Sequence, residues 1–196
     1  MNNPRHSANS TIWGTPPYII EPARLVLGSI DLDPASSARS NKIIKARDYF
    51  TKKQNGLTQR WQAYDLTRPT SIWLNPPGGW HNGEVGNSEV KQWWRKTLIE
   101  RRQPYFGHML FLAFSMEALQ VTQVMCEYSL CDFPTVIFNK RIGFIDPATG
   151  KGVAGNTHAS SITYIPGRVR KTRLFFETFS ALGAPMGPIN WRNIPK

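Results

Sequence analysis

The sequence predicts an α/β fold, a three-layer α/β/α sandwich around a mostly parallel sheet. Short apolar runs typical of strands alternate along the chain with segments whose apolar residues recur at helical spacing. The 196 residues are enough for one well-packed domain, and they contain no internal repeat. We therefore expect a flexible N-terminus over residues 1–10 and a single domain over residues 11–196.

The first half of the chain predicts one helix and two strands that end in polar residues. A proline in the first turn and an apolar face predict a helix over residues 21–27. Residues 30–32 predict the first strand, and residues 33–37 predict the turn that leaves it. Residues 71–74 predict a buried strand that ends at Asn75.

The later apolar runs predict further helices and strands along the chain. They are a helix capped by Ser88 over residues 88–99, a strand over 109–114, a helix over 117–128, strands over 135–138 and 161–165, a helix or strand over 174–182, and a proline-rich tail over 183–196. Residues 139–158 form a long, glycine-rich, basic connection that exceeds a simple hairpin loop. This connection is a candidate binding element.

Composition favours a polyanionic partner. The 24 Lys and Arg against 13 Asp and Glu give a formal charge of +11. This charge favours nucleic acid over a membrane as the partner. The alternative is that the charge serves only to keep the protein soluble. The two cysteines and four scattered histidines show no metal-ligand spacing, so no metal is expected. No apolar run approaches the roughly 20 residues of a membrane span, and no signal-peptide pattern is present. We expect a cytoplasmic protein.

The stretch from Trp73 to Trp80 has the composition of a site. Two prolines after Asn75 exclude helix and central strand, and two glycines then permit close approach of a ligand. The Asn75 side-chain oxygen and the Pro76 carbonyl are two acceptors that would orient an exocyclic amine such as adenine N6. They would also stabilise the positive charge that grows on its nitrogen during methyl transfer. Asp33 follows another strand, and ligands bind at such strand ends in α/β sheets.

An ordered set of motifs supports this interpretation. The set is Trp13-x-Thr15-Pro16-Pro17, Asp31-Leu32-Asp33-Pro34-Ala35-Ser36, Tyr49-Phe50-Thr51, Gly56-Leu57, Trp61 and Leu74-Asn75-Pro76-Pro77. Over residues 11–80 it resembles the phage-type, Dam-like family of DNA N6-adenine methyltransferases. The resemblance continues loosely through Trp93-Trp94, Phe114 and Arg141-x-x-Phe144.

The resemblance implies a Rossmann-like methyltransferase fold, S-adenosylmethionine as cofactor, and adenine in DNA as a substrate that is flipped into the site. The catalytic residues implied are Asn75, Pro76, Pro77 and Trp80. The cofactor-binding residues implied are Trp13, Thr15, Pro16, Asp33, Pro34, Ala35, Asn55, Leu57 and Asn75. Asn55 stands where an acidic residue is common in the family. The resemblance also implies a role in protecting phage DNA against host restriction.

Gly78 departs from the family pattern, which has Tyr or Phe after Asn-Pro-Pro to stack on the flipped base. Trp80 is the candidate replacement, and the alternative is that it packs the loop against the core. Trp61 is interpreted as a packing residue.

The chain length leaves no separate target-recognition domain, so we expect a short or loosely defined target sequence. The expected DNA contacts are His81, Asn82, Arg141, Lys151, Arg168 and Arg170, with a solvated loop as the alternative for residues 168–173. Methylation of RNA adenine or of a protein amide, and non-catalytic DNA binding, stay open as alternatives.

Overall fold

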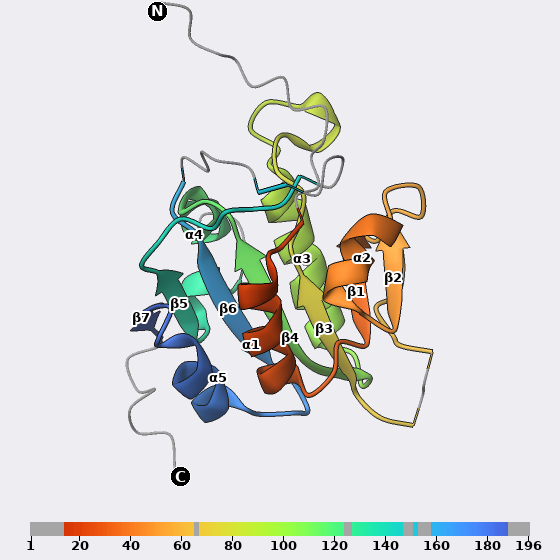
Figure 1. Cartoon of the computed structure of the whole chain (residues 1–196). Helices are drawn as coiled ribbons and strands as arrows, with labels where there is room; N and C mark the ends of the chain where they lie inside the picture. Colours follow the sequence, from red (N-terminus) through yellow and green to blue (C-terminus); the bar gives the residue numbers. More distant parts are fainter. Residues whose placement is uncertain (1–13, 65–66, 124–126, 147–150, 153–157, 188–196) are drawn as a thin grey trace, which may run out of the picture.

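The computed structural model is built of helices on both faces of a β-sheet (Figure 1). It describes residues 14–64, 67–123, 127–146, 151–152 and 158–187. The helices are α1 (Pro17–Leu27), α2 (Ala38–Ile44), α3 (Glu89–Arg101), α4 (Glu117–Gln123) and α5 (Thr172–Phe179), with 3-10 turns η1 (His81–Gly83) and η2 (Leu130–Asp132). The strands are β1 (Leu32–Ser36), β2 (Asp48–Thr51), β3 (Thr70–Leu74), β4 (Phe106–Ala113), β5 (Thr135–Phe138), β6 (Ser161–Pro166) and β7 (Gly183–Met186).

Within the described residues, seven strands form one sheet in the order β2-β1-β3-β4-β6-β5-β7. The strands from β2 to β4 pair in parallel, whereas β6, β5 and β7 continue the sheet through antiparallel pairs. The chain leaves β1 for β2 on one side and then crosses back to β3 on the other. The topological switch point therefore lies between β1 and β3, and ligands of α/β sheets bind beyond the strand ends at such a point.

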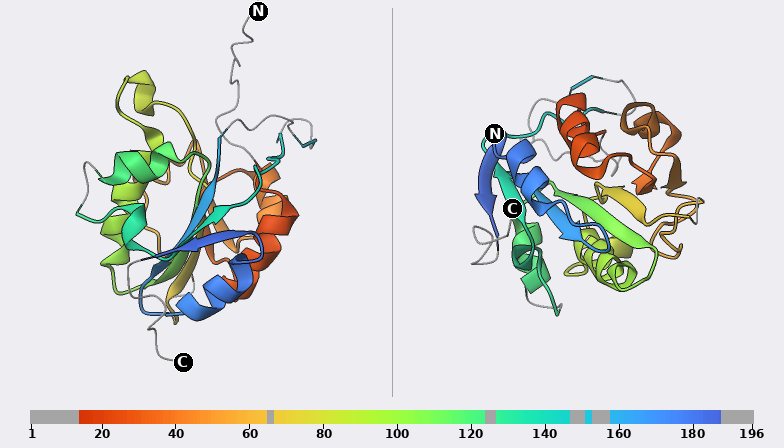
Figure 2. Two further views of the ribbon diagram at one scale, coloured as in Figure 1. Left: turned by 90° about the vertical axis from the view of Figure 1, so that its left-hand side faces the viewer. Right: turned by 90° about the horizontal axis from the view of Figure 1, so that it is seen from below.

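The two faces of the sheet carry separate hydrophobic cores. Helices α1, α2 and α5 cover one face, and α3 and α4 cover the other (Figure 2). The alternation of side chains along β3 divides its residues between them, because Trp73 joins the first core whereas Ile72 and Leu74 join the second. A strand buried on both faces carries an uninterrupted apolar run, which is how residues 71–74 were interpreted. The expected α/β/α architecture is confirmed, with a sheet that is mixed rather than mostly parallel.

Several element boundaries differ from the prediction for physical reasons. Helix α1 starts at Pro17, because a proline fits the first helical position, and Pro22 lies inside it. Asp33 lies within β1 rather than in the turn after it, because the β1–β2 register shifts between Asp33 and Ser36 and accommodates Pro34. Ser88 occupies the N-cap position of α3 as predicted, but its side chain makes no capping hydrogen bond.

Strand β7 was missed, because residues 183–186 read as the start of a proline-rich tail. A Cβ at Gly183 would lie 2.0 Å from the Ile137 carbonyl oxygen, so only glycine allows this close approach to β5. Pro185 is tolerated because β7 is the last strand in the order of the described sheet.

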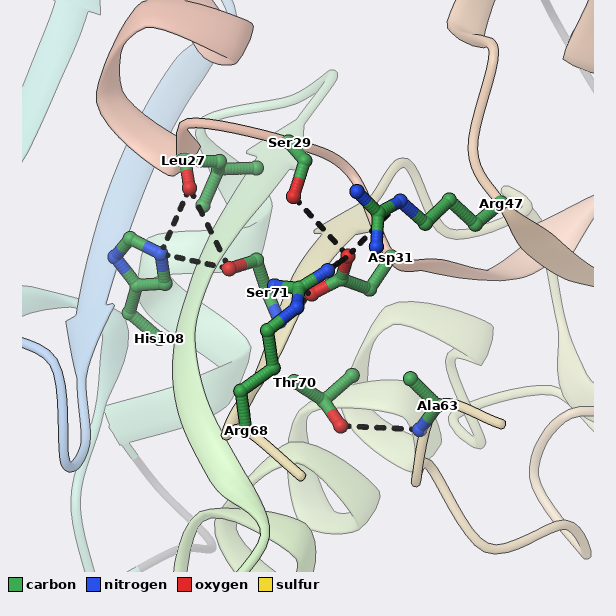
Figure 3. A network of polar contacts seen from close by, with 9 residues as sticks. All are labelled: Leu27, Ser29, Asp31, Arg47, Ala63, Arg68, Thr70, Ser71 and His108. Atoms are coloured by element: carbon green, nitrogen blue, oxygen red, sulfur yellow. Dashed lines mark hydrogen bonds and ion pairs between the residues drawn. The ribbon is translucent and has the colours of Figure 1, made fainter. Parts of the chain in front are cut away.

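A buried polar network joins the amino-terminal ends of β1, β3 and β4 (Figure 3). The Asp31 carboxylate accepts hydrogen bonds from Arg68 and, at 2.9 Å, from the Ser71 amide. Ser71 Oγ lies 3.0 Å from His108 Nε2, and burial lowers the pKa of His108 to about 4. The network lies at the edge of the sheet opposite Asn75, so Asp31 belongs to the scaffold.

Candidate active site

Asn75 lies directly after β3, and Thr15 holds its side chain. The Asn75 Nδ2 amine donates a hydrogen bond of 3.3 Å to Thr15 Oγ1, which lies 60 residues away in the sequence. Thr15 is 1% exposed, and Pro16 after it is the N-cap of α1. The Thr15 hydroxyl fixes the position of the Asn75 side chain, and in the structure Nδ2 is directed to Thr15, with Oδ1 at the acceptor end of the amide. The Thr-Pro-Pro segment thus orients Asn75.

Asp33 lies across the switch point from Asn75, on β1. Its carboxyl group is 1% exposed and accepts a 3.1 Å hydrogen bond from the Ala35 amide. Burial raises the pKa of Asp33 from 3.8 to about 7. A carboxyl group that titrates near neutral pH at a strand end is a candidate for ligand recognition.

A cavity of about 400 Å³ opens beyond the ends of β1 and β2. Phe50, Leu57 and Trp93 give it an apolar lining, and Thr51 and Asn55 add polar groups. This size and mixture are typical of small-molecule sites. Such a lining suits a ligand that combines a planar ring with hydrogen-bonding groups.

The loop over residues 55–57 approaches β1 closely to shape this cavity. A Cβ at Gly56 would lie 2.0 Å from the Pro34 carbonyl oxygen, so glycine is required there. Asn55 has a φ of 53°, a left-handed conformation that asparagine tolerates. The Trp61 indole donates a 2.8 Å hydrogen bond to the Gly56 carbonyl and stacks on Trp93, which confirms Trp61 as a packing residue.

The glycine-rich loop after Pro77 lines the cavity, and backbone hydrogen bonds join its two ends. Trp80 and Ser88 form a β-bridge, and the Glu89 amide donates to the Gly79 carbonyl at 3.0 Å. The Glu89 carboxylate lies 3.1 Å from His81 Nδ1 and accepts a 3.2 Å hydrogen bond from the Trp93 indole. The loop is therefore tied to α3 beside the cavity.

The long connection after β5 lies beside the Thr-Pro-Pro segment. Gly14 and Ile145 exchange two backbone hydrogen bonds of 2.8 Å each, and Ile145 also bridges to Gly152. The exposed Arg141 and Lys151 therefore belong to the same edge of the molecule as Asn75.

The structure brings together most of the residues singled out from the sequence. The cavity is lined by the predicted residues Pro34, Ala35, Asn55, Leu57, Pro77, Trp80, His81 and Asn82. Asn75, Pro76, Thr15, Pro16 and Asp33 lie beside it on β3, β1 and the segment before α1. Trp80 is 52% exposed, so it does not pack the loop against the core. Trp13 lies outside the described residues.

Arg168 and Arg170 do not share this site. They follow β6, whose last residue, Pro166, pairs with His108 near the start of β4. Because β6 runs antiparallel to β4, this end of β6 reaches the edge opposite Asn75, at the bottom of Figure 1. Their contact with DNA stays a prediction.

Other residues of the site were not assigned a role from the sequence. Phe50, Thr51 and Trp93 line the cavity and were visible as parts of the family motifs, whereas Lys52 and Glu89 carried no signal beyond their place in a loop or helix. Among the described residues, no group of three or more His, Cys, Asp or Glu side chains could hold a metal ion. No helix in the described part of the chain is long and apolar enough to span a bilayer.

Comparison with protein families gives one match. The family model for DNA N-6-adenine-methyltransferase (Dam) matches residues 4–181. The searches of curated proteins and of solved structures returned no significant match. The matched range contains the Thr-Pro-Pro segment, the cavity and the Asn-Pro-Pro turn. The chain therefore belongs to the Dam family of DNA N-6-adenine-methyltransferases.

Proposed function

We propose that this chain transfers a methyl group from S-adenosylmethionine to the N6 amine of an adenine that is flipped out of DNA into the Asn-Pro-Pro turn. Membership of the Dam family implies DNA adenine N6 methylation and hence S-adenosylmethionine. The observation that carries the detailed proposal is the orientation of Asn75, whose amide nitrogen is held by the buried Thr15.

Asn75 and Pro76 act as a pair of acceptors for the two N–H groups of the adenine amine. The side-chain oxygen of Asn75 and the main-chain oxygen of Pro76 orient the amine so that its lone pair is directed at the methyl donor. The same two oxygens stabilise the positive charge that develops on the nitrogen. The methylated ammonium is acidic enough to lose its proton to water, so this step requires no side-chain base.

The cavity beside β1 and β2 suits the cofactor. Phe50, Leu57 and Trp93 would contact its purine, and Asp33 would accept hydrogen bonds from its amino group or ribose hydroxyls. S-adenosylmethionine, when bound, supplies an electrophilic methyl group. The residues around the cavity fix its position relative to Asn75 and exclude water from the site.

The test is methyl transfer from labelled S-adenosylmethionine to adenine-containing duplex DNA, with N6-methyladenine identified after digestion to nucleosides. We expect Asn75→Ala to lower kcat by about 100- to 1000-fold, the usual cost of removing one hydrogen-bonding group from a transition state. Asn75→Asp keeps an acceptor oxygen and should retain more activity. Gln120→Ala, which truncates an exposed amide on α4, is the matched control and should be neutral.

The same assay separates the alternatives. Faster transfer to a matched RNA oligonucleotide, or to protein, would replace the substrate while keeping the cofactor. Absence of any calorimetric signal with S-adenosylmethionine would favour a non-catalytic DNA-binding protein. Transfer that Asn75→Ala leaves unaffected would remove the proposed role of the turn.

A further inference from the structure

The ring of Phe114 lies against Gly78, the residue that follows the Asn-Pro-Pro turn. A Cβ at Gly78 would lie 2.7 Å from Phe114 Cζ and 3.3 Å from Cε2. Real Cβ atoms do not approach other atoms so closely, so the ring occupies the space in which a side chain at position 78 would begin. Position 78 must therefore lack a side chain while the Phe114 ring lies there.

The Phe114 side chain is held in place by the residues around it. It follows Ala113, the last residue of β4, and β4 pairs in parallel with β3, so both chains leave the sheet at the same edge. Phe114 is partly buried and packs against both hydrophobic cores. The Ser160 hydroxyl donates a hydrogen bond of 3.5 Å to its carbonyl oxygen. The base of the ring is fixed by the core, and its outer edge reaches the turn.

A flipped base is held in its pocket by stacking on aromatic or apolar side chains in addition to its hydrogen bonds. An aromatic ring that is already immobilised loses little conformational entropy when a base stacks on it. Trp80 is the aromatic residue on the loop that follows the turn, but it is 52% exposed. Ordering Trp80 on binding would cost free energy that the anchored Phe114 does not require.

We propose that Phe114 is the residue on which the target adenine stacks, and that Gly78 is glycine because the Phe114 ring fills its place. This proposal rests on the proposed function of the Asn-Pro-Pro turn. It makes Phe114 a substrate-contacting residue contributed by β4, next to the acceptors contributed by β3.

Because the Phe114 ring and a side chain at position 78 would occupy the same space, moving the ring from one position to the other tests the proposal. We expect Phe114→Leu, which keeps bulk without the ring, to lower kcat/KM for DNA by about 10- to 100-fold, the range typical of one lost base–aromatic contact. Gly78→Phe alone should be at least as impaired, because its Cβ meets the Phe114 ring. The double variant Gly78→Phe/Phe114→Ala removes the clash and restores a ring. It should be at least tenfold more active than either Gly78→Phe or Phe114→Ala.

Three controls separate stacking from folding. Phe133→Leu removes a buried ring that packs on Trp94 away from the turn, and it should leave kcat/KM within about threefold of the wild type. Phe114→Tyr keeps the ring and should retain activity. Calorimetry should show unchanged affinity for S-adenosylmethionine in every Phe114 variant, and 2-aminopurine fluorescence at the target position should report weaker stacking in Phe114→Leu.

The outcomes distinguish this proposal from the function on which it rests. If the wild type does not methylate DNA, the proposed function fails and the stacking role falls with it. If the wild type methylates DNA but Phe114→Leu matches its kcat/KM, or the double variant is no better than the single ones, the stacking role alone is overturned.

Discussion

The carboxyl group of Asp33 is buried, and burial changes its pKa. Its pKa is raised from 3.8 to about 7 in the folded chain, chiefly by burial. The folded state therefore holds a proton that the unfolded state loses above pH 4, and the free energy of unfolding falls as the pH rises from about 4 to 7. Above pH 7 the carboxylate is charged and buried, and it gains from a ligand that donates hydrogen bonds to it.

We therefore expect S-adenosylmethionine to bind more tightly as the pH rises through 7. If the bound ligand favours the carboxylate, binding releases one proton, and the dissociation constant should increase about tenfold per pH unit between pH 7 and pH 5. Isothermal titration calorimetry in buffers of different ionisation enthalpy measures both the affinity and the released proton.

Asp33→Asn should bind more weakly at pH 8 and lose this pH dependence. His81 also lines the cavity, so His81→Gln is the matched control, and it should keep the pH dependence of the dissociation constant. If the dissociation constant of S-adenosylmethionine still depends on pH in Asp33→Asn but no longer does in His81→Gln, the effect belongs to the histidine.

At the scale of residues, the sequence located the Asn-Pro-Pro turn but not the contacts that act on it. Asn75 and Asp33 could be recognised because each follows an apolar run that predicts a strand. The binding of the cofactor by Thr15 stays a prediction, and the contact of its hydroxyl with Asn75 was not foreseen. Neither that hydrogen bond nor the approach of Phe114 to Gly78 leaves a local pattern, because each joins residues that are distant along the chain.

At the scale of elements, helix α3 shows how composition misleads. Its basic residues could have formed a phosphate-facing surface, but Lys96 pairs with Glu100 at 2.6 Å and Arg101 donates to the Pro166 carbonyl at 3.2 Å. Arg102 pairs with Glu127. Lys96 and Arg101 therefore have partners within the fold, whereas Arg102 forms an exposed ion pair, and the charge pattern alone could not predict these partners.

The apolar side of the same helix makes a quantitative stability test possible. Trp94 is fully buried, meets Phe111 and Phe133 edge to face at 5.5 and 5.6 Å, and donates a 2.7 Å hydrogen bond to the Tyr128 carbonyl. We expect Trp94→Ala to lower the free energy of unfolding by about 3–5 kcal/mol, through lost burial and the cavity left behind. Urea denaturation monitored by circular dichroism measures the change.

Ile99→Ala on the same helix is the matched control. Ile99 is 57% exposed, so its truncation should change stability by no more than about 0.5 kcal/mol. Similar losses for both variants would mean that burial of the Trp94 ring does not account for its effect, because alanine favours the helix in both cases.

The elements that the sequence predicted best are the largely buried strands. Strands β3, β4, β5 and β6 were each found at or within three residues of their predicted boundaries. Strand β7 depends on Gly183 approaching Ile137, and the reach of β1 past Asp33 depends on its pairing with β2. Such features come from tertiary contacts, so local patterns do not contain them.

At the scale of the whole molecule, the formal charge of +11 suits a partner such as DNA, and the fold distributes basic residues over two opposite edges. Arg141 and Lys151 belong to the edge that carries Asn75, whereas Arg168 and Arg170 belong to the other. A duplex whose adenine enters the Asn-Pro-Pro turn would lie along the first edge.

We therefore expect the salt dependence of DNA binding to separate the two edges. The double variant Arg141→Gln/Lys151→Gln should reduce the slope of log K against log salt concentration by about 2, because each lost phosphate contact accounts for about 0.9. Fluorescence anisotropy with a labelled duplex over a series of salt concentrations measures the slope.

Arg168→Gln/Arg170→Gln removes the same charge from the opposite edge and should leave the slope unchanged. An equal reduction in both double variants would support the sequence-based prediction that DNA also contacts residues 168–170.

The pair of hydrogen bonds between Gly14 and Ile145 connects the basic segment after β5 to the segment before α1. Ile145 belongs to the connection that carries Arg141 and Lys151, and Gly14 is covalently joined to Thr15, whose hydroxyl holds Asn75. If Arg141 and Lys151 contact DNA as proposed, a displacement at Ile145 on substrate binding would reach the Asn75 amide through three links: the Gly14–Ile145 hydrogen bonds, the Gly14–Thr15 peptide and the Thr15–Asn75 hydrogen bond. We therefore expect substitutions along these links to change the affinity for DNA and the rate of methyl transfer together.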